Sequence, residues 1–343
     1  MKKILFFLLL ILFSCSNDET QISEPVVDDL YFPAIDSDQW ETLNPEELNW
    51  DSVGIDNLYN FLQLNNTRAF VVLKDGKIVL ENYWGNNFSN TAPFDSNSNW
   101  YWASAGKTLT AFLVGIAKDN GILSLEDSSS TFLGNGWTSL EESQESLIKI
   151  KHHLTMTTGL DYLVDNLNCT DPNCLTYKNT PGTNWFYHNA TYSLLKDVIE
   201  NTSETTYNDF TNQKVKMKIG MGGSWIQSNY SNIYWSTARD MARFGLLILN
   251  EGVWDNQVIL SDTNYFSNMV NTSQQMNESY GYLWWLNGKD SLIPPGITFP
   301  IQTSLASNAP EDLIAGMGKN GQYLDVIPSQ NLVIIRMGEA PDS

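Results

Sequence analysis

A serine and a lysine three residues apart form the most reactive pair in this sequence. Ser104-Ala-Gly-Lys107 opens a segment whose apolar residues recur with helical spacing, from Leu109 to Ala117. Residues three apart share one face of a helix, and the amino end of a helix favours a developing negative charge. A partly desolvated lysine is neutral enough to take the serine proton. The pair therefore predicts a nucleophile and its activating partner, in acyl-transfer chemistry that needs no histidine, metal or other cofactor.

The Ser-x-x-Lys motif has little specificity by itself, because it recurs at 146–149 and at 193–196. A rival ordered set can be assembled from Ser146, Tyr177 and Lys218. It fails on placement, since its serine does not begin a predicted helix and no predicted sheet strand follows its lysine. The set that begins at Ser104 continues with Tyr187-His-Asn189 in a predicted turn and Lys319-Asn-Gly321 before a predicted strand.

Two predicted hairpins lie at opposite ends of the chain. The apolar runs 69–73 and 78–80 flank Asp75-Gly76, a strong short-range hairpin signal. A second pair of runs, 323–327 and 332–335, flanks a Pro-Ser-Gln-Asn turn. The middle of the chain has mainly helical spacing, for example at 191–199 and 237–249. We therefore expect an α/β (α+β) fold with one antiparallel sheet built from both chain ends and an inserted helical lobe.

The sequence motifs resemble those of the serine β-lactamase, penicillin-binding protein and related esterase superfamily, in its class C-like branch. The resemblance runs from about Trp50 to Gly338 and comprises seven segments in the order of the family. Besides the serine motif these are His153-Leu-Thr-Met-Thr-Thr-Gly159, Pro181-Gly182, Tyr187-His-Asn189, Ser236-Thr-Ala-Arg-Asp-Met-Ala-Arg-Phe-Gly245, Tyr280-Gly-Tyr-Leu-Trp-Trp285 and Gly318-Lys-Asn-Gly-Gln322 through Pro328.

The resemblance implies a two-lobed fold and a set of site residues. Residues 46–343 would form one domain, with a sheet lobe at about 46–100 and 255–343 and a helical lobe at about 104–250. Ser104 would attack a carbonyl, and the proton would pass through Lys107 and Tyr187, with the choice of base left open. Asn189 would orient the substrate or Lys107, and Lys319 would supply positive charge. Gly321 would let its strand approach the site closely, and the amides of Ser104 and Gln322 would form the oxyanion hole.

The same resemblance leaves the substrate open. The third motif is Lys-Asn-Gly, which lacks the hydroxyl of Lys-Thr-Gly, and His188 stands where a small residue is usual. Both departures disfavour β-lactam hydrolysis more than acyl transfer in general. We expect a serine hydrolase for a small ester, a D-amino-acid amide or a peptidoglycan fragment. The alternatives are a non-hydrolysing sensor of the penicillin-binding type and a true β-lactamase.

The amino end has the features of an export signal. Lys2 and Lys3 precede an apolar run that is too short to cross a bilayer. Leu-Phe-Ser-Cys15 resembles the site at which bacterial lipoproteins are cleaved and acylated. The prediction is a signal peptide at 1–14, a lipidated Cys15, and an acidic tether over 15–45 that holds the catalytic body at a bacterial membrane, facing the periplasm or the cell surface.

The remaining cysteines and the charge narrow the possible partners. Cys169 and Cys174 lie close together in an oxidising compartment, which favours a local disulfide over half of a zinc site. The formal net charge is −20, and such a surface repels nucleic acid. We expect no nucleic-acid partner, and the sequence does not determine the oligomeric state.

Two further motifs suggest other chemistry. The three histidines could supply a Ser/His/Asp triad, with His188 as the best placed, but His152 and His153 are adjacent and their side chains should diverge. Gly316-Met-Gly-Lys-Asn-Gly321 matches a dinucleotide-binding pattern, yet a strand is predicted after it, where that fingerprint needs a helix. Neither motif outweighs the serine and lysine pair.

Overall fold

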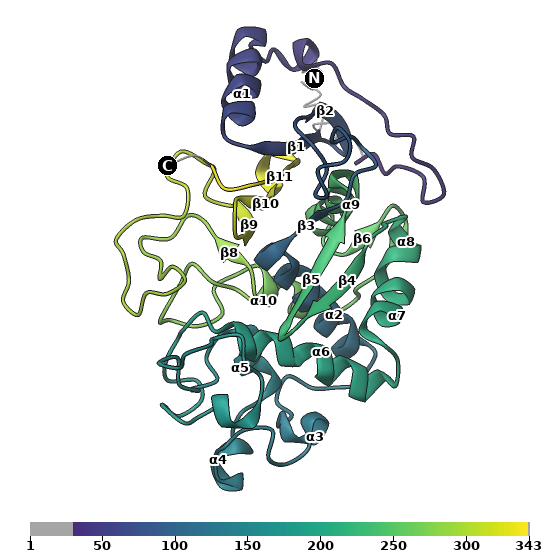
Figure 1. Ribbon diagram of the computed structural model, residues 1–343. Coiled ribbons are helices and arrows are strands. Elements are labelled where there is room, and N and C mark those ends of the chain that lie inside the picture. Colours follow the sequence, from purple (N-terminus) through teal and green to yellow (C-terminus); the bar gives the residue numbers. More distant parts are fainter. Residues whose placement is uncertain (1–29, 342–343) are drawn as a thin grey trace, which may run out of the picture.

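A six-stranded antiparallel sheet joins the two ends of the chain in the computed structural model, which describes residues 30–341 (Figure 1). The first hairpin contributes β1 (Thr67–Lys74) and β2 (Lys77–Tyr83). The last part of the chain contributes β8 (Trp285–Leu286), β9 (Ile314–Gly318), β10 (Gln322–Ile327) and β11 (Leu332–Gly338). The order is β2-β1-β11-β10-β9-β8, so the prediction of one antiparallel sheet made from both chain ends is confirmed.

The turn between β1 and β2 depends on Asp75 and Gly76. Both have left-handed backbone angles, with φ of 51° and 82°, as a two-residue hairpin turn that follows the twist of its strands requires. A Cβ on Gly76 would lie 1.9 Å from the backbone oxygen of Tyr31. The glycine therefore serves the turn and also leaves room for the chain that passes over it.

Helix α9 (Ala238–Leu249) packs on the sheet against β10, β11 and β1. Its start is fixed by a capping box, in which Thr237 and Asp240 satisfy each other's backbone N–H groups. At Gly245, an added Cβ would lie 2.4 Å from Val333 and 2.9 Å from Leu324, so glycine allows the helix to approach the strands closely. The predicted helical lobe of about 104–250 therefore extends too far, because its last helix belongs to the sheet lobe.

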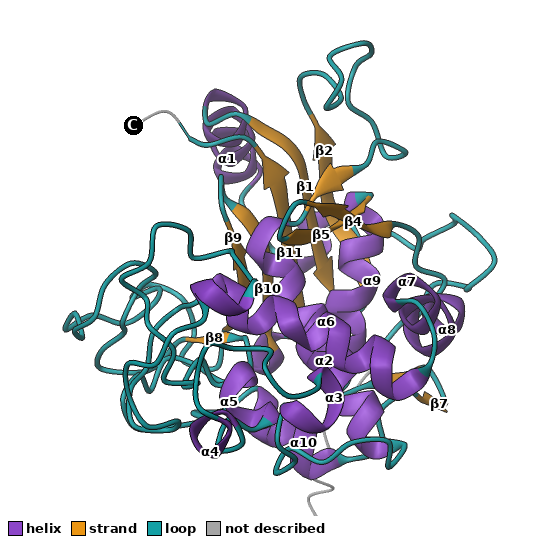
Figure 2. Ribbon diagram, turned by 60° about the horizontal axis from the view of Figure 1, so that its bottom comes forward, coloured by secondary structure: helices purple, strands orange, loops and turns teal. Residues whose placement is uncertain are grey.

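The helical lobe is organised around α2 (Gly106–Asp119), which contacts both β9 and α6 (Asn189–Ser203) (Figure 2). The sequence predicts one apolar face for α2, whereas the structure buries every residue from Gly106 to Ala117, since the sheet and the other helices enclose the helix. Shorter helices complete this part of the chain, namely α3 (Ser130–Leu133), α4 (Glu142–Glu145), α5 (Ile150–Leu154), α7 (Tyr207–Thr211), α8 (Met217–Ile219) and, after α9, α10 (Thr263–Met269).

Smaller elements connect the two lobes. A three-stranded sheet has the order β3-β5-β4, and β6 pairs with β7. The three-stranded sheet was not predicted, and its first strand leads directly into the segment that carries Ser104. The bounds are β3 (Trp100–Tyr101), β4 (Ser224–Ser228), β5 (Ser231–Ser236), β6 (Val253–Trp254), β7 (Gln257–Val258), a π-helix at Asn212–Lys216, and 3-10 turns at Pro45–Leu48, Ala103–Ala105, Pro172–Cys174 and Pro328–Gln330.

The chain ahead of α1 (Ser52–Leu64) is part of the folded body from residue 30 onward. The amide of Tyr31 donates to Asp75 at 3.0 Å, and the amide of Leu43 donates to Ile78 at 2.9 Å. Arg243 of α9 donates to backbone oxygens of residues 33, 34 and 37. The prediction of a tether over 15–45 is therefore wrong for its second half, where scattered apolar residues pack on the core without a periodic pattern.

The predicted signal peptide at 1–14 and the predicted lipidation at Cys15 lie outside the described residues. Between residues 30 and 341, the structure contains no helix that is both long enough and apolar enough to cross a membrane.

Candidate active site

Ser104 lies in a sharp connection between β3 and α2. Ala103, directly before it, has a left-handed φ of 48°, a conformation that residues other than glycine rarely adopt and that recurs at functional sites. Trp102 anchors the segment, since its side chain is fully buried and its Nε1 donates to Ser236 Oγ at 2.8 Å. The backbone amide of Ser104 lies in the first turn of this helical segment, where N–H groups lack helical partners. The local fold therefore presents the serine hydroxyl and amide together.

Lys107 lies one helical turn further on and is only 2% exposed. Its Nζ donates to Ser104 Oγ at 2.9 Å and to Asn189 Oδ1 at 3.0 Å. Among residues 30–341, no carboxylate lies within ion-pair distance of this ammonium. Burial lowers the pKa of Lys107 to about 7. Near neutral pH a large share of the side chain is therefore the free amine, which can accept a proton.

Tyr187 and Asn189 reach the same point from the start of α6. His188 is the N-cap of this helix, so the residues on either side of it leave the turn toward Lys107. Tyr187 is buried, and its ring stacks on Trp285 of β8 with centroids 5.7 Å apart. Burial raises the pKa of Tyr187, while a hydrogen bond with the nucleophile opposes the rise. The phenol is therefore neutral at physiological pH and can donate a hydrogen bond.

The end of β9 packs directly on the nucleophile segment. A Cβ on Gly318 would lie 2.4 Å from the backbone oxygen of Trp102 and 3.1 Å from the amide nitrogen of Ala105, so only glycine fits there. The carbonyl of Gly318 accepts from the amide of Gly321 across the hairpin turn, at 3.2 Å. In a trans peptide the N–H points opposite to the C=O, so the Lys319 amide points away from the interior of this turn.

Two predicted site residues lie on the other side of this turn. A Cβ on Gly321 would lie 2.4 Å from Arg336 Nη1. Gln322 pairs with Gly318 in the β9–β10 ladder, and its buried side chain bonds both backbone groups of Gly338. Gly321 and Gln322 therefore do not line the pocket at Ser104 as predicted, whereas Met317, Gly318 and Lys319 of the same hairpin do. The Lys-Asn-Gly motif forms the hairpin turn itself, which strand propensity alone does not reveal.

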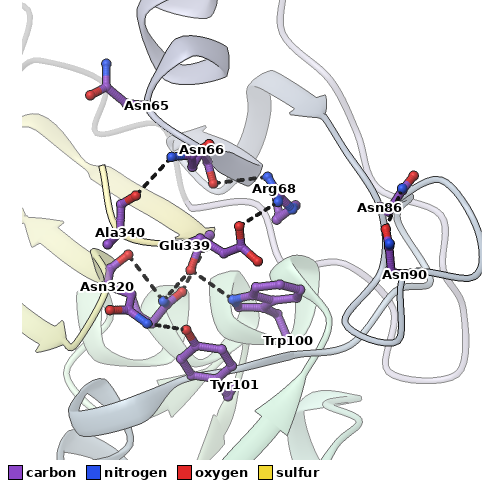
Figure 3. Close-up of polar contacts among 12 residues, drawn as sticks. Asn65, Asn66, Arg68, Asn86, Asn90, Trp100, Tyr101, Asn320, Glu339 and Ala340 are labelled. Atoms are coloured by element: carbon purple, nitrogen blue, oxygen red, sulfur yellow. Dashed lines mark hydrogen bonds and ion pairs between the residues drawn. The ribbon is translucent and has the colours of Figure 1, made fainter. Parts of the chain in front are cut away.

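Arg336 of β11 holds this turn in place. Its Nη1 donates to the backbone oxygens of Asn320 at 3.1 Å and Gly321 at 2.6 Å, and its Nη2 donates to that of Asn65 at 2.6 Å. Figure 3 shows the Asn320 side chain beside Tyr101, and Asn320 Nδ2 donates to the tyrosine hydroxyl at 2.7 Å. Because Tyr101 directly precedes the nucleophile segment, these contacts fix the turn relative to Ser104.

A pocket of about 450 Å3 opens at Ser104. Tyr187, Asn189 and Lys319 also line it, so the structure brings together five predicted residues: these three, Ser104, and Lys107 behind it. Most of the wall is apolar and consists of Leu167, Trp285, Leu292, Pro294, Pro295, Leu305 and Met317. Lys319 is the one charged residue of this lining, and none of the described residues forms an ion pair with it.

Cys169 and Cys174 form the predicted disulfide, with Cα atoms 5.9 Å apart. The bridge closes part of the long loop that ends at Tyr187. Leu167 of the same loop lines the pocket, two residues before the first cysteine. The disulfide therefore restrains a wall of the pocket rather than the reacting groups.

The histidines have other surroundings. His153 Nε2 lies 2.8 Å from Ser129 Oγ, yet both residues are completely buried and neither lines the pocket at Ser104. His188 Nε2 lies 3.2 Å from the backbone oxygen of Asp161, and His188 does not line the pocket at Ser104. The arrangement does not form a triad with Ser104. The glycine-rich stretch 316–321 forms a strand and a hairpin turn, without the helix that a dinucleotide fingerprint requires.

A second cavity of about 500 Å3 lies between residues 35–40 and α9. Its three basic groups and Asp240 already have protein partners, and Lys216 among them donates to the backbone oxygen of Gly223. Arg239 forms two hydrogen bonds with Glu81, Asp240 caps α9, and Arg243 binds backbone oxygens of residues 33–37. We therefore assign this cavity a structural role and place the reactive site at Ser104.

Tyr192 and Trp285 contribute to the site but were not predicted. Tyr192 follows Asn189 by three residues, so helical spacing from the Tyr-x-Asn motif could have placed it beside Lys107. Its ring centroid lies 3.9 Å from Lys107 Nζ. Trp285 belongs to an aromatic run in which no local signal separates a pocket residue from the core.

Comparisons with known proteins agree with this geometry. A sequence model of the family described as Beta-lactamase matches residues 67–341. No curated protein sequence matches the chain significantly. Among solved structures, a candidate 6-aminohexanoate-dimer hydrolase from Bacillus anthracis has a TM-score of 0.64 at 19% identity, over 83% of this chain and 77% of its own. A candidate β-lactamase from Bacteroides dorei DSM 17855 has a TM-score of 0.65 at 17% identity, over 85% and 92%. A penicillin-binding protein from Bacillus halodurans has a TM-score of 0.63 at 16% identity, over 83% and 96%. At these identities the structures establish the shared fold.

Proposed function

Since the chain belongs to the β-lactamase family, in the superfamily that contains penicillin-binding proteins, we propose that it is a serine hydrolase that cleaves small esters or amides through an acyl-enzyme on Ser104. The observation that carries the proposal is the contact of 2.9 Å between Ser104 Oγ and Lys107 Nζ. The amine is buried, without a counter-ion among the described residues, and its lowered pKa makes it a base at neutral pH.

The acylation step begins with transfer of the Ser104 proton to Lys107. The oxygen attacks the substrate carbonyl and forms a tetrahedral intermediate, whose negative charge needs donors placed in advance. As the bond to the leaving group breaks, Tyr187 donates its proton to that group and is reprotonated by Lys107. Water then attacks the acyl-enzyme with the same groups acting in reverse, which releases the acid and restores Ser104.

Lys107 rather than Tyr187 is our choice of base. Burial lowers the pKa of the amine to about 7, whereas burial raises the pKa of the phenol. A phenolate in this enclosed position is therefore a minor species, while the free amine is abundant. The phenol keeps the role of a proton carrier between Lys107 and the leaving group.

The amides of Ser104 and Lys319 are the oxyanion donors that the geometry supports. The first lies at the amino end of the helical segment, and the second points away from the Gly318 carbonyl. Glycine at position 318 lets the end of β9 lie close to the nucleophile segment, because a side chain at this position would collide with that segment. The proposal replaces the Gln322 amide that the sequence suggested.

The apolar wall of the pocket supports a substrate with an apolar acyl or alkyl portion. One structural neighbour is described as a candidate 6-aminohexanoate-dimer hydrolase, whose named substrate is a linear amide with methylene chains. Such a chain would fit beside Pro294, Leu305 and Met317, and a D-amino-acid amide or a peptidoglycan stem fragment remains compatible. The backbone that faces Ser104 carries Met317 and Gly318, which offer no side-chain hydroxyl to a β-lactam carboxylate, so a β-lactamase activity is the weaker alternative.

Activity-based labelling tests the nucleophile directly. A fluorophosphonate probe and a fluorescent penicillin should label the wild-type chain, and Ser104→Ala should abolish the labelling. Equal labelling of both proteins would rule out Ser104. A panel of nitrophenyl esters, linear amides, D-amino-acid amides and β-lactams would then rank the substrates. A stable stoichiometric adduct without turnover on any of them would favour the sensor alternative.

The cellular setting is proposed from the sequence alone. We infer export by the signal at 1–14 and membrane attachment through a lipid on Cys15, which would place the pocket in the periplasm or at the cell surface. Globomycin treatment, which blocks lipoprotein signal cleavage, would test this by causing the uncleaved precursor to accumulate.

A further inference from the structure

The Lys107 ammonium has an unusual set of neighbours for a buried cation. It carries three N–H donors, and the described residues offer two acceptors, Ser104 Oγ and Asn189 Oδ1. The remaining close groups are aromatic faces. Nζ lies 3.9 Å from the ring centroid of Tyr192 and 4.9 Å from that of Tyr187. Both distances are well within the range of cation–π attraction, and the site is desolvated, where this attraction is strongest.

Tyr192 is placed for this contact by the helix that starts at the Tyr-x-Asn motif. It lies three residues after Asn189 in α6, so both side chains project from the same face toward Lys107. The ring is 9% exposed, and its hydroxyl lies 3.5 Å from the backbone oxygen of Asn232, which is a long contact. Lys107 Nζ lies 3.9 Å from the ring centroid, so the face of the ring is what Lys107 meets.

We propose that the Tyr192 ring is a positioning residue, which holds the Lys107 amino group against Ser104 and sets the pH at which that group becomes a base. The inference rests on the proposed function, because it concerns the same lysine. The ring stabilises the protonated form through its quadrupole and leaves the free amine largely unaffected. Without the ring, burial would dominate and the lysine would lose its proton at a lower pH.

The other titratable groups described around Lys107 supply no negative charge, and the ring of Tyr187 adds a second, longer cation–π contact at 4.9 Å. Tyr187 faces the amine from the turn before α6, and Tyr280 lies behind Tyr187 with ring centroids 6.2 Å apart. Burial raises the pKa of both phenols, so they are neutral when the lysine titrates. Lys319 lines the pocket on the side of β9, and a positive charge there would disfavour the protonated form.

A series of isosteric rings at position 192 tests the proposal. Tyr192→Phe retains the aromatic face and should titrate like the wild type. Replacement of the same side chain by 4-fluoro- and 3,4,5-trifluorophenylalanine withdraws electron density from that face at nearly constant shape. The pKa of Lys107 should then fall stepwise, by about one unit for the trifluoro ring, as the cation–π contribution of a desolvated site is removed. The readout is the 13Cε resonance of Lys107, assigned by its loss in Lys107→Met.

The 13Cε resonance of Lys107 is measured without any substrate. A failure of the inference on Tyr192 can therefore be distinguished from a failure of the proposed function. A pKa that stays constant or rises along the fluorinated series overturns the role of Tyr192. If the pKa falls and the acidic limb of kcat/KM moves with it, both the ring and the base assignment are supported. If the pKa falls while the limb stays in place, the ring inference holds and the choice of Lys107 as base is wrong. Tyr192→Met, which fills a similar volume without a ring, should also lower the pKa.

Discussion

Replacing Lys107 by methionine should remove activity and, at neutral pH, make the protein more stable. The wild-type side chain is 2% exposed, and burial lowers its pKa from 10.5 to about 7. Each unit of difference between the folded and unfolded pKa corresponds to about 1.4 kcal/mol. The protonated lysine therefore costs the folded state about 5 kcal/mol at pH values below 7. Lys107→Met removes this cost together with the base.

The sign of the pH dependence follows from the direction of the shift. Between the folded pKa of about 7 and the unfolded value of 10.5, the unfolded chain binds more protons than the folded one. Stability of the wild type therefore rises with pH in this window, by up to about 1.4 kcal/mol per unit. Methionine does not titrate, and it leaves Ser104 Oγ and Asn189 Oδ1 without their donor, which costs about 2 kcal/mol. The variant should be more stable by about 3 kcal/mol at pH 6 and less stable above about pH 9.

Urea unfolding followed by circular dichroism at pH 6, 7.5 and 9 measures this difference directly. Other titrating groups contribute equally to both proteins, so they cancel in the comparison. Lys319→Met is a matched control, because this lysine is exposed and its loss should change stability little at any pH. Equal stability of Lys107→Met and wild type at pH 6, or a difference that is constant from pH 6 to 9, would refute the depressed pKa. The loss in kcat/KM should be about 100- to 10,000-fold, as expected for a general base.

Three further predictions concern the groups around this lysine. Tyr187→Phe should lower kcat by about 10- to 100-fold through the lost proton carrier, while the acidic limb of kcat/KM stays near pH 7; a limb that disappears would identify the phenol as the base. Gly318→Ala should lower kcat at least about tenfold, because the new methyl group would lie 2.4 Å from the Trp102 oxygen and push β9 away from the nucleophile. Unchanged kinetics would contradict the proposal that the Lys319 amide is an oxyanion donor. The double substitution Cys169→Ser and Cys174→Ser should lower the free energy of unfolding in urea by about 2 kcal/mol, as expected for a short closed loop. KM should rise by a larger factor than kcat falls, and the wild type under reducing conditions should show the same changes.

The parts of the structure that the sequence predicts are those encoded by local signals. Asp75-Gly76 is placed in its hairpin because few other dipeptides adopt two left-handed residues in succession. The nucleophile helix is recognisable because its apolar spacing begins directly after Ser104. Tyr187 and Asn189 could be placed because the Tyr-x-Asn motif is compact and lies at the start of α6. Each of these features depends on residues within a few positions of one another.

The features that the sequence does not predict depend on distant contacts. The turn at Lys319 and Asn320 is set by Arg336, sixteen residues further along the chain, whose guanidinium binds the turn carbonyl oxygens. Without that contact, Lys-Asn-Gly is equally compatible with the start of a strand, as the sequence prediction assumed. Residues 30–45 have no periodicity, yet they pack on the core because Arg243 binds their carbonyl groups. Sequence periodicity contains no information on such contacts.

The reacting groups come from three elements that enter the site independently. The 3-10 turn Ala103–Ala105 and the helix α2 that continues it carry the proposed nucleophile and base, the turn before α6 carries the phenol, and the turn after β9 carries the proposed second oxyanion donor. Substitutions in the helical lobe should therefore alter the pH dependence of the reaction, whereas those that displace the backbone of the hairpin β9–β10 without changing its charge should lower kcat at every pH. The buried lysine connects these effects to stability, because its lack of a counter-ion among residues 30–341 both destabilises the folded chain and favours the free amine that the proposed mechanism uses as a base. An added carboxylate beside Lys107 would raise its pKa and stabilise the fold, at the expense of the chemistry.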